Sequence, residues 1–213
     1  MLGSMIPLSH DLAIPIFLVG HSMGGGEVLY YAASGPADIR QEIRGYVALA
    51  PYILLHPASQ PSRALELAGR VAMKLFPKMQ MVQKLRPEIL CRDPEVAASW
   101  EQDELCHNTG TLEGLGGMID RGAELDKGTV VIKEGSVYIA HGSKDSITSP
   151  DASKKLFEGL SLPDKTYQSY EGWFHVLHGE PGEDKIRYAN DVADWILARQ
   201  MPPGADQKDR SKL

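Results

Sequence analysis

The sequence predicts an α/β fold in which a parallel sheet is flanked by helices and carries a helical cap insertion. Two observations support this prediction. Four segments have the composition of strands, at residues 14–20, 45–50, 136–141 and 165–170, and helical patterns follow the first, third and fourth of them. Strands that alternate with helices indicate a parallel sheet that is covered on both faces.

The first three strand segments are short and mostly apolar. Residues 14–20 (IPIFLVG) and 45–50 (GYVALA) are continuous apolar runs, and residues 136–141 (SVYIAH) resemble them. Such runs are typical of strands that are buried on both faces of a parallel sheet. Residues 165–170 (KTYQSY) are more polar, so we expect this strand to lie nearer an edge.

The later helices have clear boundaries and faces. Residues 150–160 are preceded by Ser149, which suits the N-cap, and begin with Pro150, which suits the first helical position. In residues 183–199 the apolar side chains share one helical face, at Ile186, Ala189, Ala193, Ile196 and Leu197. A stripe of this kind is typical of a helix that packs on a core.

Residues 51–127 interrupt the alternation of strands and helices. They contain no convincing strand and have the pattern of short helices and loops, of which residues 62–76 are the clearest helix. We interpret this insertion as a cap (lid) over the carboxyl edge of the sheet. The chain then divides into core segments at residues 1–50 and 128–200, the cap, and a flexible tail at 201–213.

The composition is that of a globular domain, with 43% hydrophobic and 23% charged residues in a chain of 213. The net charge of -6 argues against nucleic-acid binding, which requires a basic surface. Cys91 and Cys106 have no metal-ligand spacing and provide no disulfide framework, as is typical of an intracellular, reducing compartment. No apolar run is long enough to span a bilayer.

A nucleophile-elbow motif follows the first strand. Residues 20–24 (GHSMG) fit the pattern G-x-S-x-G between a buried strand and a helix, which predicts Ser22 as a nucleophile on a strained turn. The glycines at both ends of the motif are expected to relieve crowding. The N–H of Met23 lies at the start of the helix and is the expected oxyanion donor. The alternative is a glycine-rich turn that contains an incidental serine.

A serine hydroxyl needs a base, and the base needs an acid that fixes its orientation. Asp145 comes four residues after the third strand and His175 five after the fourth, so both are expected at the same sheet edge as Ser22. This chain order of serine, acid and histidine is that of α/β-hydrolases. Asp120 and Asp126, in the expected cap, and His178 are the alternatives. The remaining histidines, at positions 10, 21, 56, 107 and 141, are interpreted as structural, without metal-ligand spacing.

Three stretches resemble the monoacylglycerol lipase family, especially its fungal members: GHSMGGGEVLYYA, YIAHGSKDSITSPDASKKLFEGL and YEGWFHVLHGEPGEDKIRYANDVADWI. The resemblance extends from about residue 14 to 199. It implies the α/β-hydrolase fold, a catalytic triad of Ser22, Asp145 and His175, and hydrolysis of a monoacylglycerol through an acyl-enzyme. No metal or organic cofactor is required. Alternatives are another acyl ester such as a lysophospholipid, acyl transfer to an alcohol, or a non-catalytic fragment that binds lipid or protein.

Part of the cap is basic. Residues 62–92 hold seven Lys or Arg and two Glu, a local charge of +5 in a chain of net charge -6, together with Met73, Met79 and Met81. A basic, amphipathic, Met-rich segment is typical of contact with a membrane or lipid-droplet surface. A solvated helix face over an ordinary core explains the same pattern equally well.

Both ends of the chain lead to further expectations. The elbow strand begins about fourteen residues after Met1, whereas the family has several strands and a second oxyanion donor before its elbow. We therefore expect a truncated chain, without the N-terminal strands, that is poorly soluble and impaired in activity. Ser211, Lys212 and Leu213 match the S-K-L address read by the peroxisomal import receptor. Otherwise the resemblance suggests the cytosol or the surface of lipid droplets or endoplasmic reticulum.

Overall fold

The computed structural model describes residues 14–82, 85–106 and 108–200. Its centre is a four-stranded parallel sheet with the strand order β1-β2-β5-β6. The strands are β1 (Ile16–His21), β2 (Ile43–Leu49), β5 (Ser136–Gly142) and β6 (Lys165–Tyr170). All four predicted strands and the parallel sheet are confirmed, with boundaries that differ by at most two residues.

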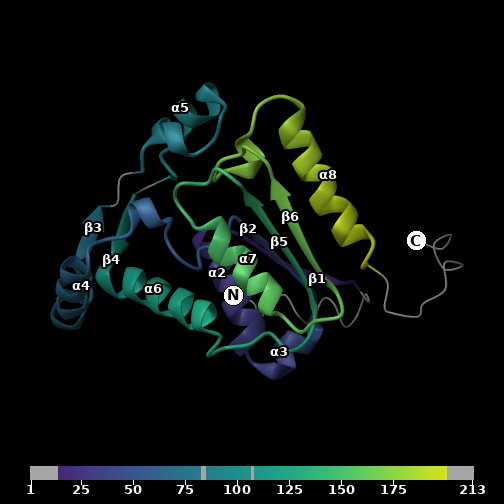
Figure 1. The fold of residues 1–213 in the computed structure, drawn as a ribbon, viewed down its shortest axis with the longest axis horizontal. Helices are drawn as coiled ribbons and strands as arrows, with labels where there is room; N and C mark the ends of the chain where they lie inside the picture. The colour runs from purple at the N-terminus through teal and green to yellow at the C-terminus, as the bar shows by residue number, and fades with distance from the viewer. Residues whose placement is uncertain (1–13, 83–84, 107, 201–213) are drawn as a thin grey trace, which may run out of the picture.

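Helices cover both faces of this sheet (Figure 1). On one face lie α2 (Met23–Ser34), α6 (Leu112–Lys127) and α7 (Pro150–Gly159). On the other face lies α8 (Glu183–Leu197). The short α3 (Ala37–Glu42) connects α2 to β2. The predicted α/β fold is therefore confirmed.

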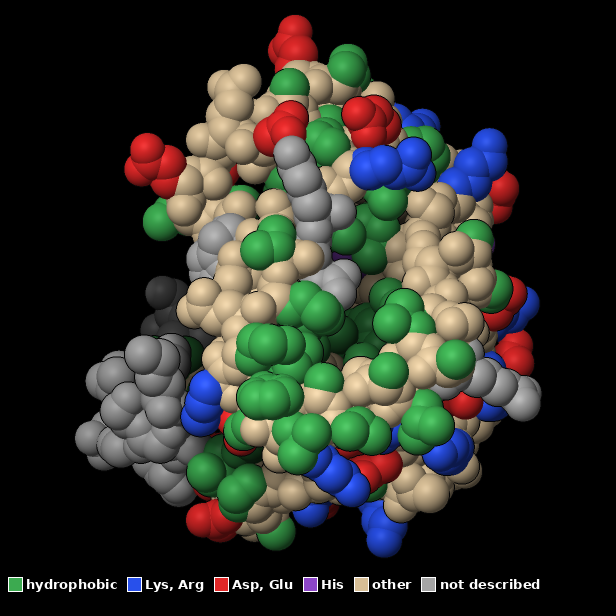
Figure 2. All heavy atoms as spheres, turned by 90° about the vertical axis from the view of Figure 1, so that its left-hand side faces the viewer, with side chains coloured by type: hydrophobic (Ala, Val, Ile, Leu, Met, Phe, Trp, Pro, Cys, Tyr) green, Lys and Arg blue, Asp and Glu red, His purple; other side chains and the backbone are tan. Residues whose placement is uncertain are grey.

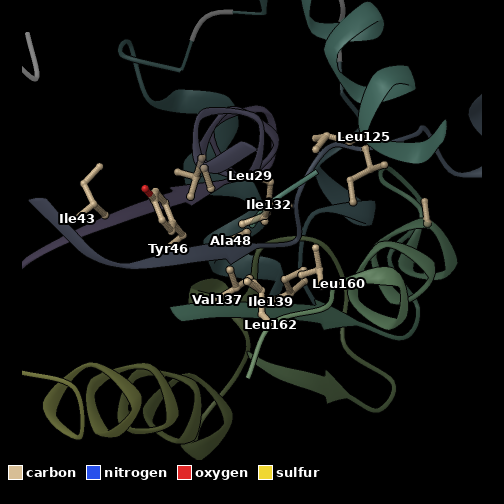
Figure 3. Packing of buried hydrophobic residues seen from close by; sticks show 14 residues of the cluster. Leu29, Ile43, Tyr46, Ala48, Leu125, Ile132, Val137, Ile139, Leu160 and Leu162 are labelled. Atoms are coloured by element: carbon tan, nitrogen blue, oxygen red, sulfur yellow. The ribbon is translucent and has the colours of Figure 1, made fainter. Parts of the chain in front are cut away.

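The alternation of side chains along β2 produces a separate hydrophobic cluster on each face. Tyr46 and Ala48 point into the cluster shared with α2, α6 and α7, which Figure 3 shows with Leu29 and Leu125. Val47 and Leu49 point into the cluster shared with α8. Because successive side chains of a strand face opposite sides, one apolar strand fills both clusters. This is why its sequence shows no polar alternation.

β1 is less buried than its apolar sequence predicts. It pairs with β2, and within the described residues it has no second neighbour. Its side chains are only partly covered, and Val19 is 48% exposed. Among the described residues β1 thus forms an edge of the sheet.

The expectation that residues 51–127 contain no strand is wrong. β3 (Gln80–Val82) and β4 (Thr109–Thr111) form a small antiparallel sheet beside α4 (Arg63–Leu75), and α5 (Pro94–Gln102) lies between them in the chain. Three-residue strands are too short to leave a pattern in the sequence. In Figure 1, α4, β3 and β4 lie to one side of the central sheet.

The last part of the expected cap packs with the core. α6 lies against α2, and its Leu125 is 2% exposed within the main hydrophobic cluster. At Gly122, α6 also comes close to the segment that follows β2, because a Cβ there would lie 2.2 Å from the carbonyl oxygen of Ile53. We therefore use "insertion" below for residues 51–111, from the end of β2 to the start of α6.

Two predicted helix starts are confirmed by their caps. The Ser62 hydroxyl accepts the N–H of Leu65 at 3.3 Å, and the Ser149 hydroxyl accepts the N–H of Ala152 at 3.2 Å. The C-terminal Ser-Lys-Leu and residues 1–13 lie outside the described part of the chain. Over the described residues, no helix combines the length and apolar character needed to cross a membrane.

Candidate active site

The elbow places Ser22 between the end of β1 and the start of α2. Ser22 has φ 56° and ψ -119°, a conformation that a residue with a side chain rarely adopts. Neighbouring backbone holds it there: its N–H donates to the Leu49 carbonyl at 2.9 Å, and its carbonyl accepts the N–H of Tyr52 at 2.8 Å. This strained turn presents the hydroxyl at the carboxyl edge of the sheet.

The two glycines of the elbow motif have different roles. A Cβ at Gly20 would lie 2.2 Å from the backbone oxygen of Gly24, so only glycine fits at position 20. A Cβ at Gly24 would meet no atom within 4 Å. The predicted relief of crowding is therefore supported for Gly20 and wrong for Gly24.

The structure brings Ser22, His175 and Asp145 into one hydrogen-bonded series. His175 Nε2 lies 2.9 Å from Ser22 Oγ, and His175 Nδ1 lies 2.7 Å from Asp145 Oδ2. Asp145 is 2% exposed and His175 is 3% exposed. The three residues follow β1, β5 and β6. Because these strands are parallel, their carboxyl ends lie at the same edge of the sheet. This geometry allows His175 to take the proton of Ser22 while Asp145 orients the ring.

Five donors surround the carboxylate of Asp145. Its Oδ1 accepts the N–H groups of Ile147 at 2.8 Å and Thr148 at 3.0 Å. Its Oδ2 faces His175, the Thr148 hydroxyl at 2.9 Å and His141 Nε2 at 3.0 Å. Burial raises the pKa of Asp145, but the hydrogen bonds from His141 and His175 outweigh burial and hold that pKa well below its usual range. Asp145 is therefore ionised at neutral pH.

His141 and Thr148 are contacts of this site that the sequence interpretation missed. His141 was expected to be structural, and it is fully buried at the end of β5. Its Nδ1 lies 2.9 Å from the Ser153 hydroxyl, while its Nε2 faces Asp145. The sequence feature that could have indicated this contact is the position of His141 at the end of β5, four residues before Asp145 in the loop that follows.

The alternative residues lie elsewhere or in other roles. Asp120 and Asp126, both on α6, form ion pairs with Arg70 at 2.9 Å and with Lys155 at 2.8 Å. His178 lies in a short 3-10 turn (Leu177–Gly179), with its ring 5.6 Å from the ring of His21. Among the described residues, none of these three forms a hydrogen bond or ion pair with Ser22.

His21 contacts the backbone of His175. Its Nε2 lies 3.0 Å from the carbonyl oxygen of His175. Burial, and the like charge that His175 can carry, lower the pKa of His21 to about 4. His21 is therefore neutral at neutral pH, and its Nε2–H can donate to that carbonyl. Of the other histidines expected to be structural, His56 accepts the N–H of Ala58, and positions 10 and 107 lie outside the described residues.

Met23 is the first residue of α2, so its N–H belongs to the helix-start donors that have no partner within the helix. Such N–H groups point toward the end of the helix, where Ser22 lies. Within the described residues, no group of three or more His, Cys, Asp or Glu side chains is arranged to hold a metal ion.

The comparisons with known proteins agree with this fold. The chain is 33% identical to a putative monoglyceride lipase of Schizosaccharomyces pombe over 90% of its own length and 50% of the relative. It is 29% identical to the monoglyceride lipase of Saccharomyces cerevisiae over 86% of its own length and 60% of the relative. The chain thus spans only about half to three fifths of these relatives.

A solved structure has the same arrangement of elements. A soluble variant of the Saccharomyces cerevisiae monoglyceride lipase, in complex with a substrate analog, matches with a TM-score of 0.85 and 26% identity over 94% of this chain and 67% of that one. The model of the family described as "Serine aminopeptidase, S33" matches residues 5–182. Since this match covers most of the sequence, the chain belongs to that family of α/β-hydrolases, with monoglyceride lipases among its relatives.

Proposed function

We propose that this chain carries the catalytic residues of a serine ester hydrolase that acts on monoacylglycerol. The observation that supports the proposal most directly is the 2.9 Å contact between Ser22 Oγ and His175 Nε2, with Asp145 behind the histidine. The substrate class is inferred from the relatives that are named monoglyceride lipases.

In the proposed reaction, Ser22 Oγ attacks the ester carbonyl carbon while His175 Nε2 takes the hydroxyl proton. Asp145 stabilises the resulting imidazolium, and the N–H of Met23 donates to the carbonyl oxygen as it becomes negative. The ester C–O bond then breaks, and glycerol leaves with the proton from His175. Water, deprotonated by His175, attacks the acyl-enzyme and releases the fatty acid and free Ser22. These steps use protein groups and water, without a cofactor.

A fluorophosphonate probe followed by a substrate assay tests this proposal. We expect the probe to label Ser22, and we expect glycerol release from 1-oleoylglycerol that Ser22→Ala abolishes. A parallel assay with lysophosphatidylcholine separates the two substrate classes. Labelling of Ser22 with turnover of lysophosphatidylcholine alone would keep the serine mechanism and reject the substrate, and an unlabelled Ser22 would reject both.

We also propose that the insertion contacts a lipid surface. Large apolar side chains are exposed along α4 and the segment after it, at Leu65, Leu67, Val71, Leu75, Phe76, Met79, Met81 and Val82. Figure 2 shows apolar side chains gathered around a hollow on the face that lies to the left in Figure 1. A contiguous exposed apolar patch of this kind marks an interaction site more often than a solvated face.

The apolar surface, more than the basic charge, supports this contact. Arg70 is neutralised by Glu66 and Asp120, and Lys78 by Glu113. We therefore expect binding to uncharged phosphatidylcholine vesicles, with only a modest gain from anionic lipid.

Vesicle sedimentation with a matched pair of variants tests this contact. Leu67→Glu removes an apolar side chain that is 66% exposed on α4. Leu197→Glu does the same at 52% exposure on α8, which lies on the opposite side of the molecule from α4 in Figure 1. We expect Leu67→Glu alone to weaken binding. Equal loss in both variants, or none, would contradict the proposed surface.

A further inference from the structure

A buried carboxylate near His175 has no part in the proposed chemistry. Glu180 is fully buried, five residues after His175 in the chain. A buried carboxylate is costly unless it is paired and hydrogen-bonded. The partners of Glu180 therefore indicate what its burial accomplishes.

Glu180 joins the loop that carries His175 to the insertion. Its Oε1 accepts the N–H of Phe174 at 2.7 Å. Its Oε2 accepts the guanidinium Nε of Arg92 at 2.6 Å and the backbone N–H of Arg92 at 3.3 Å. Arg92 belongs to the insertion, 88 residues away along the chain, and it also pairs with Asp184 at the start of α8.

A second connection runs beside the first. The N–H of Val176 donates to the carbonyl of Leu90 at 2.7 Å. The side chains of Leu90 and Val176 are 1% and 2% exposed and pack in one hydrophobic cluster with Ile147 from the loop of Asp145. The strap at residues 90–92 thus contacts the loops of both the acid and the base.

These contacts hold the backbone on both sides of His175. The N–H of the preceding residue donates to Glu180, and the N–H of the following residue donates to the carbonyl of Leu90. The carbonyl oxygen of His175 itself lies 3.0 Å from His21 Nε2. Two of the three connections lead to the insertion. A shift of the strap would therefore move His175 relative to Ser22, and a misplacement of about 1 Å can cost on the order of 100-fold in rate.

We propose that Glu180 and Arg92 are positioning residues that align His175 with Ser22 and couple that alignment to the insertion. The proposal rests on the proposed function of Ser22 and His175. It gives the insertion a second role, because a lipid that displaces the insertion would change the position of the base.

The test replaces the ion pair without leaving a buried charge. In the double variant R92M/E180M, both side chains become apolar with similar volume, so no buried charge is left unpaired, while the N–H of Phe174 loses its acceptor. The matched control is Asp184→Asn, which removes the outer partner of Arg92 and leaves the contacts of Glu180 in place. Both variants are made in the full 213-residue chain.

Two readouts are compared. Hydrogen exchange followed by mass spectrometry reports the amides of residues 172–178, which we expect to exchange at least about tenfold faster in R92M/E180M. Hydrolysis of p-nitrophenyl acetate reports alignment, and we expect kcat to fall by about 10- to 100-fold with KM within about twofold. Asp184→Asn should match the unsubstituted chain in both.

The outcomes separate this inference from the proposed function. A chain whose Ser22 is never labelled by fluorophosphonate refutes the proposed function, while the exchange rates still decide whether Glu180 holds the loop. Unchanged exchange, or unchanged kcat in a chain that is active, overturns the positioning role. Should R92M/E180M fail to fold, Arg92→Lys, which keeps the charge and withdraws the Nε donor, is compared with Asp184→Asn in the same way. Equal exchange and equal kcat in these two variants would again overturn the proposal.

Discussion

Replacing Asp145 by Asn provides the most demanding test of the site, because the substitution changes one atom in a crowded donor set. In the structure, two backbone N–H groups face Oδ1, and three side-chain donors face Oδ2. An amide has only one oxygen. Whichever way the Asn side chain turns, its amino group faces either two or three donors that have lost their acceptor.

The expected loss of stability follows from the better of these two orientations. With the amide oxygen toward His175, the N–H groups of Ile147 and Thr148 remain without an acceptor. An unsatisfied buried donor costs about 1–3 kcal/mol, so we expect unfolding to become easier by about 2–6 kcal/mol. Asp151→Asn, an exposed aspartate in the first turn of α7, is the matched control and should cost at most about 1 kcal/mol.

The difference between wild type and Asp145→Asn should depend on pH. The folded structure depresses the pKa of Asp145, so its ionised form stabilises the fold above the usual carboxyl pKa of about 3.9. That contribution is lost as the pH falls below 3.9 toward the folded value. Urea unfolding at pH 7 and at pH 3.5 should therefore give a smaller difference at the lower pH.

We expect Asp145→Asn to lower kcat even under conditions in which the variant is folded. Substituting the acid of a serine–histidine–acid series by Asn typically lowers kcat by roughly 10⁴-fold, because the histidine adopts the wrong tautomer. The rate of p-nitrophenyl acetate hydrolysis, measured where Asp145→Asn is still folded, checks this value. A folded Asp145→Asn whose kcat is within about tenfold of the wild-type value would refute the reasoning. So would a free energy of unfolding within about 1 kcal/mol of the wild-type value.

Four further predictions follow from the described residues and from the tail. Ser22→Ala should leave the melting temperature unchanged and lower kcat by roughly 10⁶-fold; more than a few per cent residual turnover would contradict this. Because the pKa of His21 is lowered to about 4, the melting temperature of the wild type should decline as the pH falls from 6.5 to 4. In His21→Gln the melting temperature should depend less on pH over the same range. Gly26→Ala places a Cβ 2.2 Å from a backbone oxygen and should destabilise by about 1–3 kcal/mol, whereas Gly24→Ala, with open space, should not; equal melting temperatures would contradict this. A fluorescent protein that carries the last twelve residues, with Ser-Lys-Leu at its end, should enter peroxisomes, and a diffuse signal would contradict that address.

Local sequence determined the strands, the helices and the positions of the site residues along the chain. The apolar runs of β1, β2 and β5 and the N-caps at Ser62 and Ser149 depend on neighbours within a few residues, and sequence displays such neighbours directly. The parallel sheet then requires that the loops after its strands meet at one edge. For this reason the chain positions of Ser22, Asp145 and His175 were sufficient to expect them together.

Tertiary structure alone decided the features that depend on distant partners. The pairing of β3 with β4 joins segments about thirty residues apart, and each is too short to have a periodicity of its own. α6 resembles any amphipathic helix in sequence, and its place in the core layer depends on the close approach at Gly122.

The surroundings of the candidate site were hidden for the same reason. His141 lies near Asp145 in sequence, but its contact depends on the turn that folds the loop back over the end of β5. Glu180 and Arg92 are 88 residues apart, and Arg92 lies outside the three stretches that carry the family resemblance. The Glu180 carboxylate is fully buried, and burial is a property of the packed molecule that no single stretch of sequence contains.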